Sequence, residues 1–337
     1  MKRSTLRVVI MGASSGIGAA TAVAFARQGA DLVLGARGKE GLDDVARQCF
    51  RAGGRAETVV VDATDARAVE AFAREARSIL GQIDLWFSNV GAGVVGKYHD
   101  VPMADHRQVI ETNLLTHMND AHAVLPIFLE QDHGIWVNMI SSGGYVATPY
   151  AAAYSASKFG LRGFSAALRA ELGKRRHIHV CDVYPTFVDT PGFSHAGNYT
   201  GARLSYPPGA LAPETVADAV VKLARNPRDT TAIGAPAAAM KATQLAPNLI
   251  AAGMNRLMDA WARRAERTRD TRGALYEPPH GASGVHADAS RLNQPRPQPK
   301  AQPKAQPSQP ANKALVAGAA VVAAAIGMQL LRKRAAQ

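Results

Sequence analysis

Cysteine is scarce in this chain. Cys49 and Cys181 are the two cysteines among its 337 residues, which excludes both a disulfide framework and a cysteine-rich zinc site. A reducing compartment fits this composition best. Apolar residues make up 47% and charged residues 20%, as in soluble globular proteins. This balance excludes a wholly disordered chain and a polytopic membrane protein.

Acidic residues are absent from residues 293–337. The net charge of the whole chain is +12, which by itself would suggest a nucleic-acid partner. Residues 293–337 account for +7, so residues 1–292 carry only +5. We therefore expect no nucleic-acid partner, but a basic tail of the kind that meets membranes or polyanions. Its basic residues are Arg296, Lys300, Lys304, Lys313, Arg332, Lys333 and Arg334.

A long apolar run is also missing near the N-terminus. Lys2 and Arg3 precede the apolar run Leu6–Met11, which is too short for the core of a signal peptide. A glycine-rich segment beginning at Gly12 then interrupts the run. We expect no cleaved signal peptide.

Residues 1–235 alternate short β-rich runs with longer helical patterns, which predicts an α/β domain. Several of the predicted strands are continuous apolar runs, as a parallel sheet covered by helices on both faces requires. The fold class is therefore a doubly wound, Rossmann-type parallel sheet. The predicted strands are Arg7–Met11, Asp31–Gly35, Glu57–Val61, Ile83–Ser88, Gly134–Ile140, His177–Val183 and Thr231–Gly234. The predicted helices are Ala19–Gln28, Ala66–Leu80, Ala156–Leu172 and Pro213–Arg225.

Residues 236–292 are expected to form a helical extension. A helix at roughly Asn248–Arg267 has apolar residues on one face, which predicts packing on its own domain or on a second subunit. Contact of this helix with a membrane surface is the alternative. The apolar residues are Ile250, Met254, Leu257, Met258 and Trp261.

Two further segments complete the chain. Residues 293–313 are rich in Pro, Gln and Lys, which predicts a disordered linker. Residues 314–331 contain no charged residue and are followed by three basic ones, which predicts a membrane-anchor helix. It would hold a cytoplasmic catalytic domain at the inner membrane. A soluble or self-associating helix is the alternative for this segment.

A glycine-rich segment follows the first strand directly. Its sequence is Gly12-Ala13-Ser14-Ser15-Gly16-Ile17-Gly18. Glycines let the chain turn tightly and let a pyrophosphate approach the amides, and the N-terminus of the next helix attracts the anion. The spacing G-x-x-x-G-x-G differs from the commoner G-x-G-x-x-G fingerprint. We predict a dinucleotide site here; a glycine-rich turn without a ligand is the alternative.

The end of the second strand indicates which dinucleotide binds. Arg37 stands there, and no acidic residue occurs between Val33 and Lys39. A guanidinium can pair with the 2′-phosphate of NADP, whereas a carboxylate would bind the ribose hydroxyls of NAD. NADP is therefore favoured over NAD, and Lys39 and Ser14 are expected to add contacts to its 2′-phosphate. The alternative is that Arg37 is a solvated loop residue.

Tyr154 and Lys158 lie four residues apart near the start of a predicted helix, and so share one face of it. An ammonium near the phenol is expected to lower the tyrosine pKa, so that Tyr154 exchanges a proton with a carbonyl or alcohol oxygen. Ser141 ends the preceding strand and can offer its hydroxyl to the same oxygen; the adjacent Ser142 is the alternative.

Together these motifs resemble the short-chain dehydrogenase/reductase family, in its compact NADP-preferring branch, over about residues 4–235. The resemblance rests on the order and spacing of Gly12, Gly16, Gly18, Asp62, Asn89-Val90-Gly91, Asn113, Ser141, Tyr154, Lys158 and Pro185 to Thr190. Two departures are Val90, where the family usually has Ala, and Thr186, where it usually has Gly.

The resemblance implies a role for each matching residue. Tyr154 would be the acid/base, Ser141 would polarise the carbonyl, and Lys158 would tune the tyrosine and hold the nicotinamide ribose. Asn113 would shape a helix bend and keep a proton-relay water. The cofactor site would comprise Gly12, Ser14, Ser15, Gly16, Ile17, Gly18, Arg37, Asp62, Asn89, Gly91, Tyr154, Lys158, Pro185 and Thr190.

The function expected from these residues is an NADP(H)-dependent oxidoreductase that interconverts a carbonyl and a secondary alcohol. The segment 192–208 contains Phe193, His195, Tyr199, Leu204 and Tyr206 and is expected to close over an apolar substrate. A non-catalytic NADP-binding regulator or a membrane-tethered scaffold on the same fold is the alternative. No metal is expected, because His117, His122, His177 and His179 lack further ligands.

Overall fold

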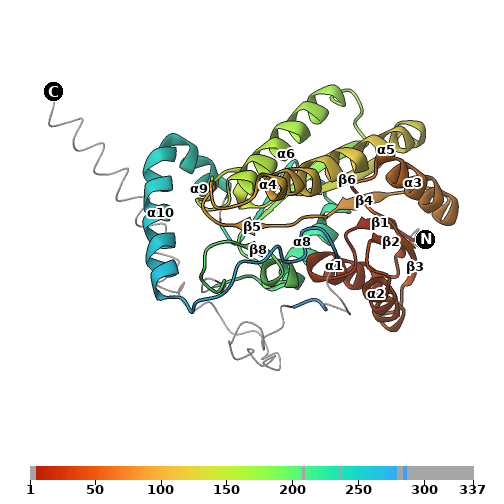
Figure 1. Ribbon diagram of the computed structural model, residues 1–337. Helices are drawn as coiled ribbons and strands as arrows, with labels where there is room; N and C mark the ends of the chain where they lie inside the picture. The colour runs from red at the N-terminus through yellow and green to blue at the C-terminus, as the bar shows by residue number, and fades with distance from the viewer. Residues whose placement is uncertain (1–4, 207–208, 236, 279–283, 287–337) are drawn as a thin grey trace, which may run out of the picture.

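A parallel sheet forms the centre of the molecule (Figure 1). The computed structural model describes residues 5–206, 209–235, 237–278 and 284–286. Within these residues the main sheet has seven strands in the order β3-β2-β1-β4-β6-β7-β9, and all neighbours are parallel. The predicted doubly wound α/β fold is confirmed.

The strands lie close to their predicted positions. The first, β1, coincides with its prediction, and the others differ by a few residues at their ends, where strands are least regular. Their bounds are β1 Arg7–Met11, β2 Asp31–Ala36, β3 Arg55–Val60, β4 Leu85–Ser88, β6 Gly134–Met139, β7 Ile178–Pro185 and β9 Thr230–Ile233. A second, two-stranded sheet pairs β5 Val94–Val95 with β8 Gly197–Asn198 and was not predicted.

The helices include several that the sequence analysis did not delimit. Helix α3 matches its prediction, whereas α6 begins four residues earlier than expected and so includes Tyr154. The helices are α1 Gly16–Ala26, α2 Lys39–Arg51, α3 Ala66–Leu80, α4 Met103–Ile110, α5 Thr116–Gln131, α6 Ala152–Glu171, α7 Pro191–Ser194, α8 Pro213–Leu223, α9 Ala237–Ala242 and α10 Pro247–Arg264. Short irregular helices are η1 Glu111–Leu115, η2 Ser142–Gly144 and η3 Thr243–Leu245.

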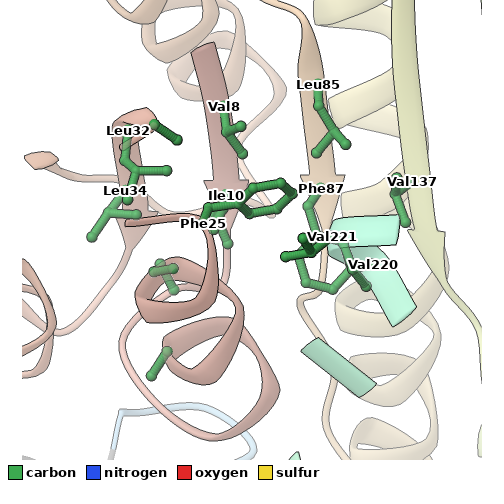
Figure 2. Close-up of a cluster of buried hydrophobic side chains, with 14 of the residues drawn as sticks. Val8, Ile10, Phe25, Leu32, Leu34, Leu85, Phe87, Val137, Val220 and Val221 are labelled. Carbon is green, nitrogen blue, oxygen red and sulfur yellow. The ribbon is translucent and has the colours of Figure 1, made fainter. Parts of the chain in front are cut away.

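Both faces of the sheet are buried. Side chains alternate along β1, so that Val8 and Ile10 join one apolar cluster while Val9 and Met11 join another. Figure 2 shows the first cluster, in which Phe25 of α1 and the valines of α8 pack onto β1, β2 and β4. Helices α3 and α5 cover the other face. This two-sided burial explains the continuous apolar strands of the sequence.

The carboxyl ends of the central strands, called the crevice below after the place where ligands of such sheets bind, lie where the strand order reverses. After β3 the chain crosses β1 to form β4 on the other side, so the strand order reverses between β1 and β4. Ligands of doubly wound sheets bind at such a switch point. The glycine-rich segment after β1 and Asn89 after β4 both lie there.

The C-terminal extension packs onto the α/β domain through part of α10. Trp261 donates a hydrogen bond from Nε1 to the hydroxyl of Ser205 at 3.0 Å. Leu257, which was predicted to share the packed face, is 70% exposed, because it borders an open hollow between α10 and residues 203–205. No helix among the described residues is long and apolar enough to cross a membrane. The linker 293–313 and the anchor 314–331 lie outside the described residues.

Candidate active site

The glycine-rich segment packs tightly against the ends of the central strands. The amides of Gly12 and Ala13 donate hydrogen bonds to the carbonyl oxygen of Gly35 in β2, at 2.8 and 3.1 Å. A Cβ on Gly18 would lie 2.0 Å from the carbonyl oxygen of Gly12, so only glycine fits there. Ser15 caps α1 in an extended conformation, and its side chain makes no capping hydrogen bond. The amide of Gly16, the first of α1, donates to the carbonyl oxygen of Gly284 at 3.0 Å, so the N–H groups that follow it are the ones that could hold an anion.

Asn89 links this segment to β4. Its Nδ2 donates to the carbonyl oxygen of Gly12 at 3.1 Å. The side chain therefore braces the turn that follows β1. Ile17 packs against the apolar cluster on that side of the sheet, which fixes the first turn of α1.

Arg37 ends β2 and is not simply solvated. Its Nη1 donates to the backbone carbonyl of Tyr276 at 2.6 Å, and Tyr276 belongs to the C-terminal extension. Lys39 pairs with Asp43 at 3.0 Å on the exposed side of α2. At the end of β3, the carboxylate of Asp62 accepts hydrogen bonds from the amide and the hydroxyl of Thr64. Ser14 touches Gly41 near the start of α2.

Tyr154 and Ser141 meet at the carboxyl end of β6. Tyr154 is half-buried, and its ring and the hydroxyl of Ser141 both lie beside Gly143, where a Cβ would be 3.1 Å from Cε1 of Tyr154 and 3.6 Å from Oγ of Ser141. Ser141 also accepts a hydrogen bond from the amide of Gly143 at 3.2 Å. Its φ of 117° is unusual for a residue other than glycine, and strain of this kind gathers at functional sites. The structure therefore brings Ser141, rather than Ser142, to the phenol.

Lys158 lies one turn further along α6. Its side chain is buried, and Nζ donates to the carbonyl oxygen of Met139 at 3.2 Å. Burial lowers the Lys158 pKa to about 7 and raises the pKa of Tyr154, although the hydrogen bond from Ser141 acts in the opposite direction. The expected lowering of the tyrosine pKa by Lys158 is therefore not found. Both groups lose hydration, and Nζ lies 5.8 Å from the centre of the phenol ring.

Asn113 stands in the π-helical segment η1, between α4 and α5. Its Oδ1 accepts from the amide of Ala92 at 2.6 Å, and its Nδ2 donates to the Ala92 carbonyl at 2.8 Å. It also reaches the hydroxyl of Ser157 on α6 at 3.3 Å. A π-helical turn locally widens and bends a helix, often at functional sites. Asn113 therefore lies in a π-helical turn at the position where the bend was predicted, and Gly91 lies beside both Asn113 and Lys158.

His117 supports the same loop from behind. Its side chain is fully buried, with Nε2 at 2.8 Å from the Val90 carbonyl and Nδ1 at 2.6 Å from Oδ1 of Asn138. Burial, helped by the charge of Lys158, lowers its pKa to about 3, so the ring is neutral. The sequence pattern excluded His117 as a metal ligand but gave no sign of its contact with Val90.

Thr190 and Pro185 frame the other side of the crevice. Pro185 ends β7, and Thr190 precedes α7 and packs against Gly16 of the glycine-rich segment. The hydroxyl of Tyr206 donates to the carbonyl of Thr190, and the ring of Tyr206 lies 4.6 Å from that of Phe193. These contacts tie Tyr206 back to the start of α7. Among the described residues no group of His, Cys, Asp or Glu side chains could hold a metal ion.

The site thus collects the predicted residues from many separate elements. The glycine-rich segment, Asn89, Gly91, Asn113, Ser141, Tyr154, Lys158 and Thr190 surround one crevice. Arg37 and Asp62 lie at the ends of neighbouring strands β2 and β3.

Known proteins are similar to this chain in sequence. A family model described as short chain dehydrogenase matches residues 7–198. The ketoacyl reductase HetN of Nostoc sp. is 31% identical over 65% of this chain and 75% of its own length. An uncharacterized oxidoreductase of Bacillus subtilis, YxnA, is 30% identical over 83% of this chain and 79% of its own length. The 3-dehydrosphinganine reductase of Danio rerio is 31% identical over 69% of this chain and 73% of its own length.

A solved structure is also similar. The alcohol dehydrogenase from the archaeon Thermococcus sibiricus, complexed with 5-hydroxy-NADP, has a TM-score of 0.59 and 26% sequence identity. The match covers 68% of this chain and 94% of that one. With the crevice residues described above, these similarities establish that the chain is an oxidoreductase belonging to the short-chain dehydrogenase/reductase family.

Proposed function

We propose that this protein uses NADP(H) to interconvert a carbonyl group and a secondary alcohol. The observation that carries the proposal is that Tyr154 and Ser141 lie side by side over Gly143, next to the glycine-rich segment and Lys158. A protein that only bound the dinucleotide would have no need for this pair or for Lys158 beside it.

The chain's own residues would bind the cofactor and move the proton. The backbone N–H groups that follow Gly16 at the start of α1 would hold the pyrophosphate. Bound nicotinamide supplies or accepts the hydride. Ser141 would orient the substrate oxygen, and Tyr154 would give it a proton or take one. Lys158 would assist Tyr154 and hold the nicotinamide ribose.

Arg37 supports NADP over NAD. Its guanidinium stands at the end of β2, where no carboxylate competes, and it can form charge-assisted hydrogen bonds to a 2′-phosphate. The NADP analogue in the similar alcohol dehydrogenase agrees with this choice.

The substrate is proposed to be apolar. Tyr154 packs against a buried apolar cluster that includes Val94, Val101 and Val109. A substrate carbonyl at the phenol would therefore have carbon rather than charged groups beside it. The proposal assigns the chemistry to residues 1–235, with residues 236–292 as an extension packed on that domain.

A turnover assay with one substitution tests this function. NADPH oxidation should be measured with a panel of apolar aldehydes and ketones for the wild type and for Tyr154→Phe. The substitution deletes one hydroxyl, so we expect it to abolish most turnover and to leave NADPH affinity nearly unchanged. Full activity in Tyr154→Phe would overturn the mechanism.

A further inference from the structure

The chain that follows α10 returns across the face that carries Tyr154. We call residues 265–278 the strap; it runs from the end of α10 past β8 toward α1 (Figure 1). Nearly all of its side chains are exposed or half-exposed, and Leu275, at 1% exposure, is its one buried residue. A single buried leucine in an exposed segment marks the point where that segment is anchored.

Backbone hydrogen bonds fix the strap to the loop over the crevice. Asn198 of β8 and Thr271 exchange two of them, at 2.7 and 3.0 Å, while β8 pairs with β5 on its other side. The amide of Ala274 donates to the carbonyl of His195 at 2.8 Å. A Cβ on Gly273 would lie 2.1 Å from that same carbonyl oxygen, so the strap lies flat against the loop. The loop is thus held between the catalytic domain and the strap.

A buried carboxylate joins all three parts. Asp105 of α4 has a fully buried side chain. Its carboxylate accepts two hydrogen bonds. One comes from the hydroxyl of Tyr199, in the loop over the crevice, at 2.5 Å, and the other from the hydroxyl of Tyr276, in the strap, at 2.8 Å. Arg272 of the strap lies 3.7 Å from the same carboxylate. A buried carboxylate without such partners would be costly, so Asp105 favours the closed arrangement.

Leu275 reaches the apolar cluster beside the catalytic tyrosine. It is buried together with Val94, Val101 and Val109, and Tyr154 and Tyr199 pack against that cluster. The side chain of Leu275 therefore contributes to the apolar surface next to the phenol. The carbonyl oxygen of its neighbour Tyr276 accepts a hydrogen bond from the guanidinium of Arg37. The same segment therefore also reaches the side of the crevice where the cofactor is proposed to bind.

We propose that the strap is a wall of the active-site cleft and that Leu275 limits the size of the carbonyl compound that reaches Tyr154. Asp105 is a positioning residue that holds this wall closed through Tyr199 and Tyr276. The proposal rests on the proposed function and adds a specificity-determining residue from outside the dehydrogenase domain.

Substrate size tests the role of Leu275. NADPH oxidation should be measured with phenyl ketones whose alkyl chains increase in length. Leu275→Ala should raise kcat/KM for the longest ketone relative to the shortest by about tenfold or more, because it enlarges the pocket by several carbon atoms. Leu223→Ala is the matched control, since Leu223 is 2% exposed in the core of α8, far from the strap in sequence. Equal ratios in the two variants would overturn the role of Leu275.

The contacts of Asp105 with Tyr199 and Tyr276, which we call the clasp, can be tested by proteolysis without measuring turnover. Trypsin can cut the strap after Arg267, Arg269 and Arg272, and Asp105→Asn should speed this cleavage several-fold. Tyr276→Phe should act in the same direction and also raise KM for the longest ketone more than it changes kcat. Tyr98→Phe serves as control, because Tyr98 is 58% exposed and does not contact Asp105 in the described structure. Cleavage of the wild type as fast as that of Asp105→Asn would overturn the clasp.

These outcomes separate the two proposals. If the wild type reduces no ketone, the proposed function fails. The rate of cleavage by trypsin then shows by itself whether the strap is closed. The size limit is then judged by calorimetric binding of the corresponding alcohols to protein loaded with NADP⁺. Tighter binding of the longest alcohol to Leu275→Ala than to wild type supports the limit, and equal binding overturns it.

Discussion

The ammonium of Lys158 lies 5.8 Å from the centre of the Tyr154 ring and donates instead to the carbonyl oxygen of Met139. The Lys158 side chain is buried and that of Tyr154 is half-buried, and the loss of hydration shifts each toward its neutral form: the Lys158 pKa falls to about 7 and the Tyr154 pKa rises. The Lys158 pKa has consequences for stability.

Lys158 should make stability depend on pH in a defined window. Its pKa in the folded protein, about 7, lies below its ordinary value of 10.5, so the unfolded chain binds more protons between these values. The free energy of unfolding therefore gains a term that rises with pH across this window, by at most about 1.4 kcal/mol per pH unit. Lys158→Met removes the term.

Denaturant unfolding at about pH 6 and about pH 9 measures this effect. Lys158→Met should be more stable relative to wild type at the lower pH than at the higher one. Lys174→Met is the control, because Lys174 is exposed at the end of the α6 region. A constant difference between Lys158→Met and wild type at both pH values would contradict the buried, neutral lysine.

Asp120 should make the free energy of unfolding depend on pH in the opposite direction. This carboxyl is fully buried on α5, and burial raises its pKa to about 7 from 3.8, while neighbouring Ser88 and Trp86 offset part of the rise. Its favourable contribution is present below the unfolded value and is lost as the pH rises through about 7. Asp120→Asn cannot ionise, so its gain in stability over wild type should be larger near pH 8 than near pH 5, by on the order of 1–3 kcal/mol.

Thermal or denaturant unfolding at both pH values checks this. Asp218→Asn, at an exposed position of α8, should show the same small difference at each pH. If Asp120→Asn behaves like that control, the carboxyl is not held in the protonated form.

Arg37 should determine which dinucleotide binds. Loss of a charge-assisted hydrogen bond to the 2′-phosphate should cost on the order of 1.5–3 kcal/mol, or roughly ten- to a hundredfold in affinity. Arg37→Asp should therefore weaken NADP much more than NAD, as measured by fluorescence titration. Arg51→Asp, on an exposed arginine at the end of α2, should alter both affinities little. A wild type that prefers NAD would refute the role given to Arg37.

The tail prediction concerns residues 314–331, which lie outside the described residues. Eighteen residues of helix span about 27 Å at a rise of 1.5 Å per residue, close to a hydrocarbon core of roughly 30 Å. The full chain should therefore sediment with membranes and stay there after a high-salt wash. A chain ending at Asn293 should remain in the supernatant with unchanged specific activity. Recovery of the full chain wholly from the supernatant would end the anchor hypothesis and leave the enzymatic proposal intact.

The sequence determined the layout of the domain and most of the crevice. Apolar strand runs alternate with helices over residues 1–235, and the glycine-rich segment directly follows β1. Tyr154 and Lys158 are four residues apart on one helix. These features are local, because hydrophobic periodicity and short motifs depend on neighbouring residues. Parallel strands then bring their carboxyl ends together, which gathers residues that the sequence keeps apart.

Only the tertiary structure decided how the C-terminal extension meets the crevice. Asp105 and Tyr276 are 171 positions apart, and nothing in the pattern around either residue indicates the other. The local sequence likewise does not indicate the contact of His117 with the Val90 carbonyl or that of Arg37 with the Tyr276 carbonyl. The sign of the pKa shifts at Tyr154 and Lys158 was likewise decided by burial, which depends on how the whole chain packs around these two groups.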